Sequence, residues 1–432
     1  MRQDGDPDMS SEDKQAWPDL AGRALGGSVI YANDELFAER ENLIKPEEPA
    51  FRPHTFGHKG QIMDGWETRR RREPAGDGQG DAAIVRLGCG GVVRRVVVDT
   101  SYFTGNYPPE VSVEACGAEG YPSPADLATA PWTTLVPRSP VAGDARNAFE
   151  VEPGHRATHV RLTIYPDGGV ARLRVYGEPV PDPRLLPATI DLAALENGAV
   201  VTGCSNMFYS SPANLLLPGQ ARVMGDGWET SRRRDQANDW VEVRLACAGS
   251  VEVVELDTSH FVGNAPGWAT LSGDGPDGGA ALLPRTALQP DTRHRFAVPE
   301  GPVTGQVRLD IYPDGGMARL RVLGRPTAEA RAGLADRFLG VLPEPQLADL
   351  LRAVGLPTAE AARWAETRPG PDGLPLAARA LFGLILSTYL IHIATIYFRN
   401  TRSIAGANHG HHLRRQPVRQ GGGPPGAHHP RR

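Results

Sequence analysis

The chain has 432 residues, a formal net charge of −5 and an apolar share of 40 %. This length predicts two or three domains, and the composition is typical of a soluble globular protein. The negative charge argues against nucleic acid as a partner, because nucleic-acid binding favours a basic face. Four cysteines are too few for a disulfide scaffold.

The N-terminal residues 1–25 predict a disordered lead-in, because the stretch MRQDGDPDMSSEDKQ is polar and acidic. This stretch has no apolar segment of the kind that a secretory signal needs. We therefore expect the protein in the cytoplasm.

Most of the remaining sequence occurs in two copies. His159–Gly177 (HVRLTIYPDGGVARLRVYG) and Gln306–Gly324 (QVRLDIYPDGGMARLRVLG) share 15 of 19 positions at an offset of 147. The motif DGWET occurs at Asp64–Thr68 and again at Asp226–Thr230, where the offset is 162. The order of the motifs is kept while the offset shrinks, which indicates two copies of one domain with loops of different length.

Each copy is predicted to be a β-sandwich. We place the first copy at residues 26–180 and the second at residues 188–326, with a proline-rich joint between them. Tyr165–Gly169 (YPDGG) has turn chemistry, so the flanking runs Val160–Ile164 and Val170–Val175 predict an antiparallel hairpin. Short strands separated by Gly/Pro turns favour an all-β jelly roll for each copy.

The last part of the chain has a different pattern. Residues 327–400 predict a helical extension, with two helices broken at Pro343–Pro345, because leucines recur at helical spacing. The apolar run at residues 381–398 just reaches the length of a membrane span, but we favour a helix that is buried or packs on a partner. Residues 401–432, rich in His, Arg, Gly and Pro, predict a disordered tail.

Each copy carries the same set of polar groups, which forms our candidate site. In Asp64–Glu67 and Asp226–Glu229, two acids flank a tryptophan that can exclude water. One carboxylate can then stay charged while burial raises the pKa of the other, as a general acid–base pair requires. Arginine can clamp a substrate carboxylate with two parallel hydrogen bonds, which lysine does poorly. A repeated residue can equally be one that the fold needs, such as a tryptophan that fills the core.

Several enzyme classes lack their motifs in this sequence. The chain has no phosphate-binding loop or dinucleotide fingerprint in a strand-to-helix context, no G-x-S-x-G elbow, and no H-E-x-x-H or paired C-x-x-C. These absences argue against phosphoryl transfer, dehydrogenase, serine-hydrolase and zinc-protease chemistry. The sequence requires no cofactor. Its carboxylates suit Ca²⁺ or Mg²⁺, but no ligand spacing demands either ion, which leaves the need for a divalent metal open.

The two copies together resemble the allantoicase family. The resemblance rests on Ser205–Arg234 (SNMFYSSPANLLLPGQARVMGDGWETSRRR), on the paired DGWET, DTS and GN segments and on both IYPDGG turns, and it covers about residues 25–326. It implies two jelly-roll domains of the galactose-binding type. It also implies a hydrolase of purine metabolism, in the ureide branch that degrades allantoin, which converts allantoate to ureidoglycolate and urea.

Allantoate carries one carboxylate and two ureido groups, and its hydrolysis needs an acid for the departing urea nitrogen and a base for water. We therefore expect the working groups at the motif positions. The expected catalytic residues are Asp226, Glu229, Asp64, Glu67 and His260. The expected substrate-binding residues are Arg232, Arg285, Arg69, Arg138, Asn206, Tyr312 and Tyr165, with Arg69 taken as the counterpart of Arg232.

Two other functions stay open from the residues. One is a non-catalytic tandem carbohydrate-binding module, and the other is a scaffold whose C-terminal helices recruit a partner. The carbohydrate-binding function predicts exposed aromatics on loops and a secretion signal, whereas aromatic residues make up only 6 % of the chain. For the enzyme we expect allantoate as a small-molecule partner, and neither nucleic acid nor membrane. A homo-oligomeric state, and the question of which repeat holds the working site, stay open.

Overall fold

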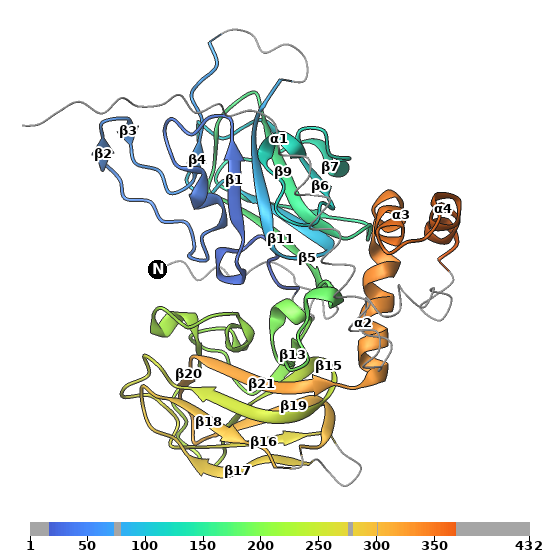
Figure 1. Cartoon of the computed structure of the whole chain (residues 1–432). Coiled ribbons are helices and arrows are strands. Elements are labelled where there is room, and N and C mark those ends of the chain that lie inside the picture. Colours follow the sequence, from blue (N-terminus) through green and yellow to red (C-terminus); the bar gives the residue numbers. More distant parts are fainter. Residues whose placement is uncertain (1–16, 73–78, 275–279, 300, 369–432) are drawn as a thin grey trace, which may run out of the picture. The chain divides into compact units, whose positions relative to one another are not determined.

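The computed structural model describes residues 17–72, 79–274, 280–299 and 301–368, which form two β-rich repeats followed by helices (Figure 1). The predicted lead-in up to residue 16, the apolar run at residues 381–398 and the tail at residues 401–432 lie outside the described residues.

Strands dominate both repeats, as the turn-rich sequence predicts. The first repeat contains η1 (Arg23–Leu25), β1 (Ser28–Ala32), η2 (Arg40–Ile44), β2 (Phe56–Gly57), β3 (Gly60–Gln61), β4 (Trp66–Glu67), β5 (Asp81–Asp99), β6 (Glu110–Cys116), α1 (Pro124–Leu127), β7 (Thr133–Pro140), β8 (Arg146–Glu150), β9 (Ala157–Tyr165), β10 (Gly169–Val170) and β11 (Arg172–Pro179). The second repeat follows η3 (Pro183–Leu185) and contains β12 (Ile190–Asp191), η4 (Leu195–Asn197), β13 (Val200–Cys204), η5 (Pro212–Leu216), η6 (Met224–Asp226), β14 (Trp228–Glu229), β15 (Asp239–Asp257), β16 (Trp268–Gly273), β17 (Ala281–Ala287), β18 (Arg293–Ala297), β19 (Val303–Tyr312), β20 (Gly316–Met317) and β21 (Arg319–Pro326).

One long strand organises each repeat. The first part of β5 pairs with β1 and β9, and its last part pairs with β8 and β11. The register shifts between Arg86 and Gly91, where the sequence is rich in glycine. A Cβ on Gly88 would lie 2.4 Å from the carbonyl oxygen of Leu25, so glycine is needed for this close approach. β15 repeats the arrangement, with β13 and β19 followed by β18 and β21. The two tandem β-sandwiches confirm the predicted fold class.

The predicted hairpin around the YPDGG turn is wrong. β9 and β11, which flank this turn, both pair with β5 instead of with each other. The residues after the turn form β10, which pairs with β4, so that Val170 lies opposite Trp66 and Gly169 opposite Glu67. In the second repeat β20 pairs with β14 in the same way. The chain therefore passes from one part of the sandwich to another at this turn, and the residues after the turn lie beside the DGWET motif.

The two motif tryptophans belong to the core. Trp66 and Trp228 are both 0 % exposed. Each indole N–H donates to a backbone carbonyl, that of Asp34 at 2.7 Å and that of Asn206 at 2.8 Å. A buried indole needs such an acceptor, and here the acceptor lies in the loop that follows β1 in the first repeat and β13 in the second. The tryptophans thus tie this loop to the motif, which is a structural role.

The first domain begins earlier than predicted, and the assignment of residues 1–25 to a lead-in is too long. Asp19 forms a β-bridge with Tyr176, and Leu20 is fully buried in the main core. Its N–H donates to the carbonyl of Val175 (2.7 Å). An apolar side chain that is removed from water anchors the segment more firmly than the local composition suggests.

The extension contains three described helices where the sequence predicted two: α2 (Ala328–Val341), α3 (Glu344–Ala353) and α4 (Thr358–Thr367). The first break falls at Pro343, as predicted, and a second one follows at Gly355, whose φ is +96°. The helices form their own cluster around Phe338, which also includes Val92 and Val180 of the first repeat. Within the described part of the chain, none of the helices has the length and apolar character to cross a membrane.

We expect Phe338→Ala to lower the free energy of unfolding by about 3–5 kcal/mol, because it leaves a cavity in a buried aromatic site. Phe338 is fully buried and lies under the guanidinium groups of Arg156 and Arg184. Urea denaturation measures the loss, with Leu185→Ala as a control because Leu185 is 79 % exposed. Equal losses in the two variants would contradict the docking of the helices on the first repeat.

Candidate functional site

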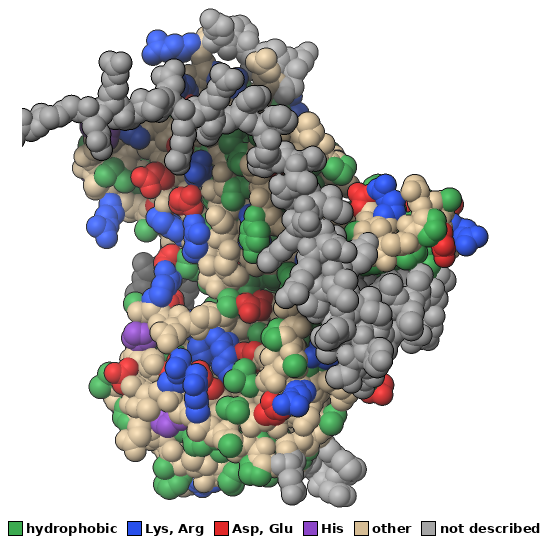
Figure 2. Space-filling view, in the orientation of Figure 1, with side chains coloured by type: hydrophobic (Ala, Val, Ile, Leu, Met, Phe, Trp, Pro, Cys, Tyr) green, Lys and Arg blue, Asp and Glu red, His purple; other side chains and the backbone are tan. Residues whose placement is uncertain are grey.

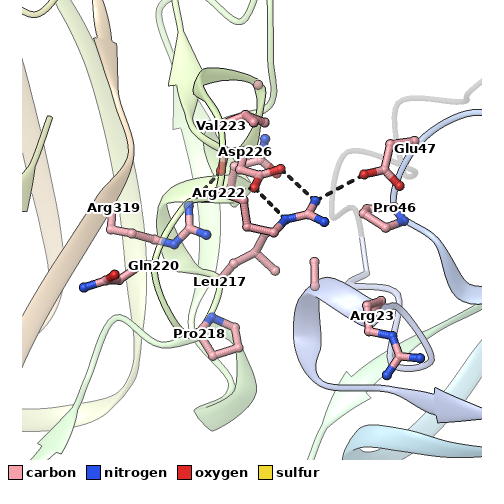
Figure 3. A pocket seen from close by; sticks show the side chains of 13 residues that line it. Arg23, Pro46, Glu47, Leu217, Pro218, Gln220, Arg222, Val223, Asp226 and Arg319 are labelled. Atoms are coloured by element: carbon pink, nitrogen blue, oxygen red, sulfur yellow. Dashed lines mark hydrogen bonds and ion pairs between the residues drawn. The ribbon is translucent and has the colours of Figure 1, made fainter. Parts of the chain in front are cut away.

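A cavity of about 480 Å³ lies between loops of the two repeats (Figure 3). Its charged lining consists of Arg23 and Glu47 from the first repeat and of Arg222, Asp226 and Arg319 from the second. Three arginines and two acids give this lining a formal charge of +1. Elsewhere basic and acidic side chains lie intermixed over the face in Figure 2. A concave site of this size with a few converging polar groups is what a small-molecule ligand needs.

Arg222 lies at the centre of the cavity wall. Its Nε donates to Oδ2 of Asp226 (3.0 Å), and its Nη2 donates to Oδ1 of Asp226 and to Oε1 of Glu47, each at 3.2 Å (Figure 3). The backbone N–H of Arg222 also donates to Asp226 (2.9 Å). One side chain therefore links a carboxylate of its own repeat to a carboxylate of the other.

Asp226 is held as a carboxylate. Burial acts to raise its pKa, but the hydrogen bonds from Arg222 and the charges of Arg222 and Arg319 outweigh burial and hold the pKa below the ordinary value. An acid with a lowered pKa can accept a proton or a hydrogen bond, and it is a poor general acid at neutral pH. Of the residues predicted from the sequence, Asp226 is the one that lines this cavity.

Arg319 forms the buried wall of the cavity. It is 4 % exposed, and it donates to the carbonyls of Asp226 and Ala318, both at 2.7 Å, and of Gly219 at 3.2 Å. Burial, with help from the charge of the neighbouring Arg321, lowers its pKa to about 10. The guanidinium is therefore still protonated at neutral pH.

Asp64, the counterpart of Asp226, has different partners. Its Oδ2 accepts hydrogen bonds from Nη2 of Arg172 (2.7 Å) and from the backbone N–H of Ala50 (3.0 Å), and Lys45 lies 3.3 Å from its Oδ1. Burial acts to raise the pKa of Asp64, but the hydrogen bonds from Arg172 and Ala50 and the charges of Arg172 and Lys45 lower it overall. The first repeat thus satisfies this carboxylate internally.

Glu67 and Glu229 occupy equivalent strands and have equivalent partners. Glu67 accepts a hydrogen bond from Asn106 (2.8 Å), and Glu229 accepts one from Asn264 (2.7 Å), which explains the paired GN segments. Burial raises the pKa of Glu67, and the hydrogen bond from Asn106 offsets this only in part. Asn264 also contacts Met224, so Glu229 lies one side chain away from the loop that carries Asp226.

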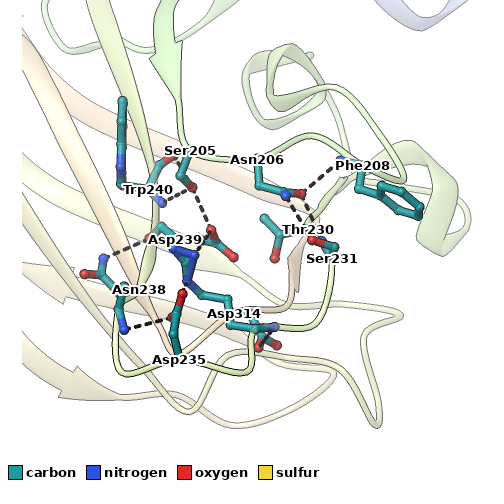
Figure 4. Close-up of polar contacts among 12 residues, drawn as sticks. Ser205, Asn206, Phe208, Thr230, Ser231, Asp235, Asn238, Asp239, Trp240 and Asp314 are labelled. Carbon is teal, nitrogen blue, oxygen red and sulfur yellow. Dashed lines mark hydrogen bonds and ion pairs between the residues drawn. The ribbon is translucent and has the colours of Figure 1, made fainter.

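Asn206 and His260 support loops around the cavity. Oδ1 of Asn206 accepts from the backbone N–H groups of Phe208 and Ser231, and its Nδ2 donates to the Ser231 hydroxyl (Figure 4). A ring nitrogen of His260 lies 3.0 Å from the carbonyl of Ala221, next to Arg222 in the chain. Neither predicted residue is part of the cavity lining.

The pairing of Arg69 with Arg232 is wrong. The backbone N–H of Arg69 donates to Asp34 (2.9 Å), just as the N–H of Ser231 donates to Asn206 (2.9 Å), so Ser231 is the counterpart of Arg69. Arg69 also forms an ion pair with Asp34 through Nε. Arg232 is exposed, and among the described residues it has no ion pair.

The two arginine–tyrosine pairs lie on other strands. Arg138 on β7 stacks over Tyr165 with 4.3 Å between the guanidinium carbon and the ring centre, and Arg285 on β17 stacks over Tyr312 at 4.4 Å. Arg138 also donates to Glu110 (2.5 and 2.8 Å). These four predicted residues are not part of the cavity lining. Within the described residues, no group of three or more His, Cys, Asp or Glu side chains is placed to hold a metal ion.

Reasoning from the sequence missed Arg222, Arg319 and Glu47. Arg319 had a signal, because it follows the second IYPDGG turn just as Arg172 follows the first. Arg222 and Glu47 lie in loops that differ between the copies, and nothing in their spacing shows that they meet across the repeats.

Comparison with known proteins agrees with this architecture. A family model described as the allantoicase repeat matches residues 18–180 and 190–327. The chain belongs to the allantoicase family. Probable allantoicases of Nocardia farcinica and Streptomyces coelicolor are 61 % and 51 % identical to it, over 71 % and 74 % of this chain and 94 % and 89 % of theirs. The crystal structure of allantoicase from Saccharomyces cerevisiae matches with a TM-score of 0.63 at 35 % identity, over 73 % of this chain and 98 % of that one.

Membership in the allantoicase family identifies the chain as an enzyme. The alternative, a non-catalytic tandem carbohydrate-binding module, is therefore not favoured. The matched residues end at 327, so the allantoicase repeats account for both sandwiches, whereas the helices from Ala328 onward lie beyond the match.

The arginine partners of the two motif aspartates differ in burial. We therefore expect substitution of the two aspartates to lower the free energy of unfolding by different amounts. Asp64→Asn leaves Arg172, which is 1 % exposed, without a carboxylate, and we expect a loss of about 2–4 kcal/mol in the free energy of unfolding at neutral pH. Asp226→Asn releases Arg222, whose side chain is 59 % exposed, and we expect about 1 kcal/mol or less.

Urea denaturation of both variants and of wild type at pH 7 and pH 3 measures these losses. The lowered pKa of Asp64 means that its contribution is present above the unfolded-state pKa, near 3.9, and is lost as the pH falls through the folded-state value. The gap between wild type and Asp64→Asn must therefore narrow at pH 3. A gap that widens there would contradict the ion-pair assignment.

Proposed function

We propose that this allantoicase hydrolyses allantoate to ureidoglycolate and urea in the cavity between its repeats. The observation that carries the proposal is the lining itself: Asp226, held as a carboxylate, shares a cavity of about 480 Å³ with Arg222 and Arg319. Allantoate is a small anion with one carboxylate, so a lining with a net positive charge favours its entry. Its ureido N–H groups are hydrogen-bond donors, and the two acidic side chains of the lining are the acceptors.

The reaction exchanges one bond at the central carbon of allantoate and moves one proton. The bond between the central carbon of allantoate and one ureido nitrogen breaks, and a new bond joins that carbon to the oxygen of water. Water loses one proton to a base, and the departing nitrogen gains one proton and leaves as urea. The lining must therefore hold the anion, orient a water molecule and accept its proton.

Asp226 is the proposed base. Its carboxylate is ionised, and its orientation is set by the backbone N–H and the side chain of Arg222. Glu47 binds the same guanidinium from the opposite repeat and accepts ureido N–H groups in this proposal. Glu229 is the second acid–base group that the sequence suggested. It lies outside the cavity lining, and its role stays a prediction. Measuring urea release from allantoate by Glu229→Gln tests it.

The remaining expectations from the sequence are still proposals. The cytoplasmic location rests on the sequence, and the oligomeric state stays open. The roles of Arg285 with Tyr312, and of Arg138 with Tyr165, require a ligand on the strand face, away from the cavity lining.

We expect Asp226→Asn to lower kcat for urea release from allantoate by about 10²–10⁴-fold, the usual contribution of a positioned general base. Urea is measured directly after incubation of the purified full chain with allantoate. Asp349→Asn is the matched control, because Asp349 lies on α3 with a side chain that is 64 % exposed. Wild type without urea release would refute the function, and folded Asp226→Asn at the wild-type rate would refute the role of Asp226.

A further inference from the structure

We propose that Arg319 receives the carboxylate of the substrate, and that the chain has one such site because Asp64 occupies the corresponding arginine of the first repeat. This inference rests on the proposed function and names the group that recognises the anion. It also answers which of the two repeats carries the working site.

Arg172 and Arg319 are equivalent residues in equivalent surroundings. Both follow the YPDGG turn and the short strand after it, at an offset of 147. Nη1 of each donates to the carbonyl of the motif aspartate, at 3.0 Å for Asp64 and 2.7 Å for Asp226, and to the carbonyl of the preceding alanine at 2.7 Å. Nε of each donates to a carbonyl of the loop before the motif. The two guanidinium groups are thus held by the same backbone frame.

The two arginines differ at Nη2. In the first repeat Nη2 of Arg172 donates to Oδ2 of Asp64 at 2.7 Å. In the second repeat the carboxylate of Asp226 is bound to Arg222, and Nη2 of Arg319 has no acceptor among the described residues. Arg319 is 96 % buried by residue and lines the cavity. This Nη2 is not among the buried atoms that lack a partner, so it is open to the cavity, and a carboxylate there accepts a charge-assisted hydrogen bond from it.

The position of Asp64 shows where that anion binds. A carboxylate oxygen at 2.7 Å from Nη2 is the geometry that the first repeat achieves with its own side chain. In the second repeat the same place beside Arg319 is open to the cavity, and the carboxylate of the substrate fills it. The ureido groups then lie toward Arg222, Asp226 and Glu47.

The same asymmetry occurs at two further positions. Arg138 of the first repeat is paired with Glu110. Its counterpart Arg285 has no ion pair in the described part of the chain, and Trp268 stands at the position equivalent to Glu110. At the third position the acid–base pair of Arg69 with Asp34 is replaced by the neutral pair of Ser231 with Asn206. The first repeat therefore neutralises its own arginines, and the second does so less completely.

Hydantoate tests the inference, because it carries one ureido group and one carboxylate but lacks the second ureido group of the substrate. Its neutral amide serves as the matched ligand. We expect wild type to bind hydantoate more tightly than the amide in calorimetry. Arg319→Gln loses this preference, with affinity for hydantoate down about 10–100-fold and KM for allantoate up by a similar factor.

Arg172→Gln is the matched control for structure. It removes the same set of backbone hydrogen bonds from the first repeat, so it lowers stability, but the preference for hydantoate over its amide stays. An equal loss of preference in Arg172→Gln and Arg319→Gln would overturn the inference. It would show that both arginines act only through the fold.

Gln220→Glu decides the question if Arg319→Gln does not fold. Gln220 lines the same cavity as Arg319 and is exposed, so Gln220→Glu adds a negative charge to the lining that repels an anionic ligand. We expect weaker binding of hydantoate and unchanged binding of the amide. Unchanged preference in Gln220→Glu overturns the inference even if wild type releases urea. Wild type that prefers hydantoate but releases no urea refutes the proposed function alone.

Discussion

A buried arginine behind the DGWET loop is the constraint on which the rest of each repeat depends. Arg172 and Arg319 hold the carbonyls of that loop against the sandwich, and their charge cannot be buried without acceptors. The YPDGG turn places these arginines, because it crosses the sandwich and forms the short strand opposite the motif. The turn, the tryptophan and the arginine thus form one unit that positions the two acids of the motif.

The cavity arises where two such units meet with unlike loops. Residues 45–64 of the first repeat form a longer loop than residues 217–226 of the second, and the longer loop brings Glu47 to Arg222. Arg222 has no equivalent contact in the first repeat, where Lys45 and the Ala50 N–H bind the aspartate instead. Neither repeat could form this lining alone, so the proposed site requires both repeats of the tandem.

Much of the fold could be predicted from the sequence, because repeated motifs and turn residues report local backbone preferences directly. The hairpin was wrong for a physical reason: turn chemistry shows that the chain reverses, whereas the long strand β5 decides which strands pair. Trp17–Leu25 was misplaced because the buried Leu20 outweighs the polar residues before it. Asp226 could be predicted as a candidate residue because it belongs to a repeated motif. Arg222 and Glu47 could not, because a contact between the two repeats produces no recognisable spacing in the sequence.

The comparison of the copies separates what the fold needs from what the ligand needs. Residues kept in both copies, such as Trp66 with Trp228 and Arg172 with Arg319, make the same backbone hydrogen bonds twice. Residues that differ between the copies change the net charge next to these shared backbone hydrogen bonds. Asp64 pairs with Arg172 in the first repeat, whereas the equivalent Arg319 of the second repeat faces a cavity. A duplicated domain can therefore keep an ion pair in one copy, where it stabilises the fold. In the other copy the equivalent arginine lacks that internal partner, which leaves a place for a small anion.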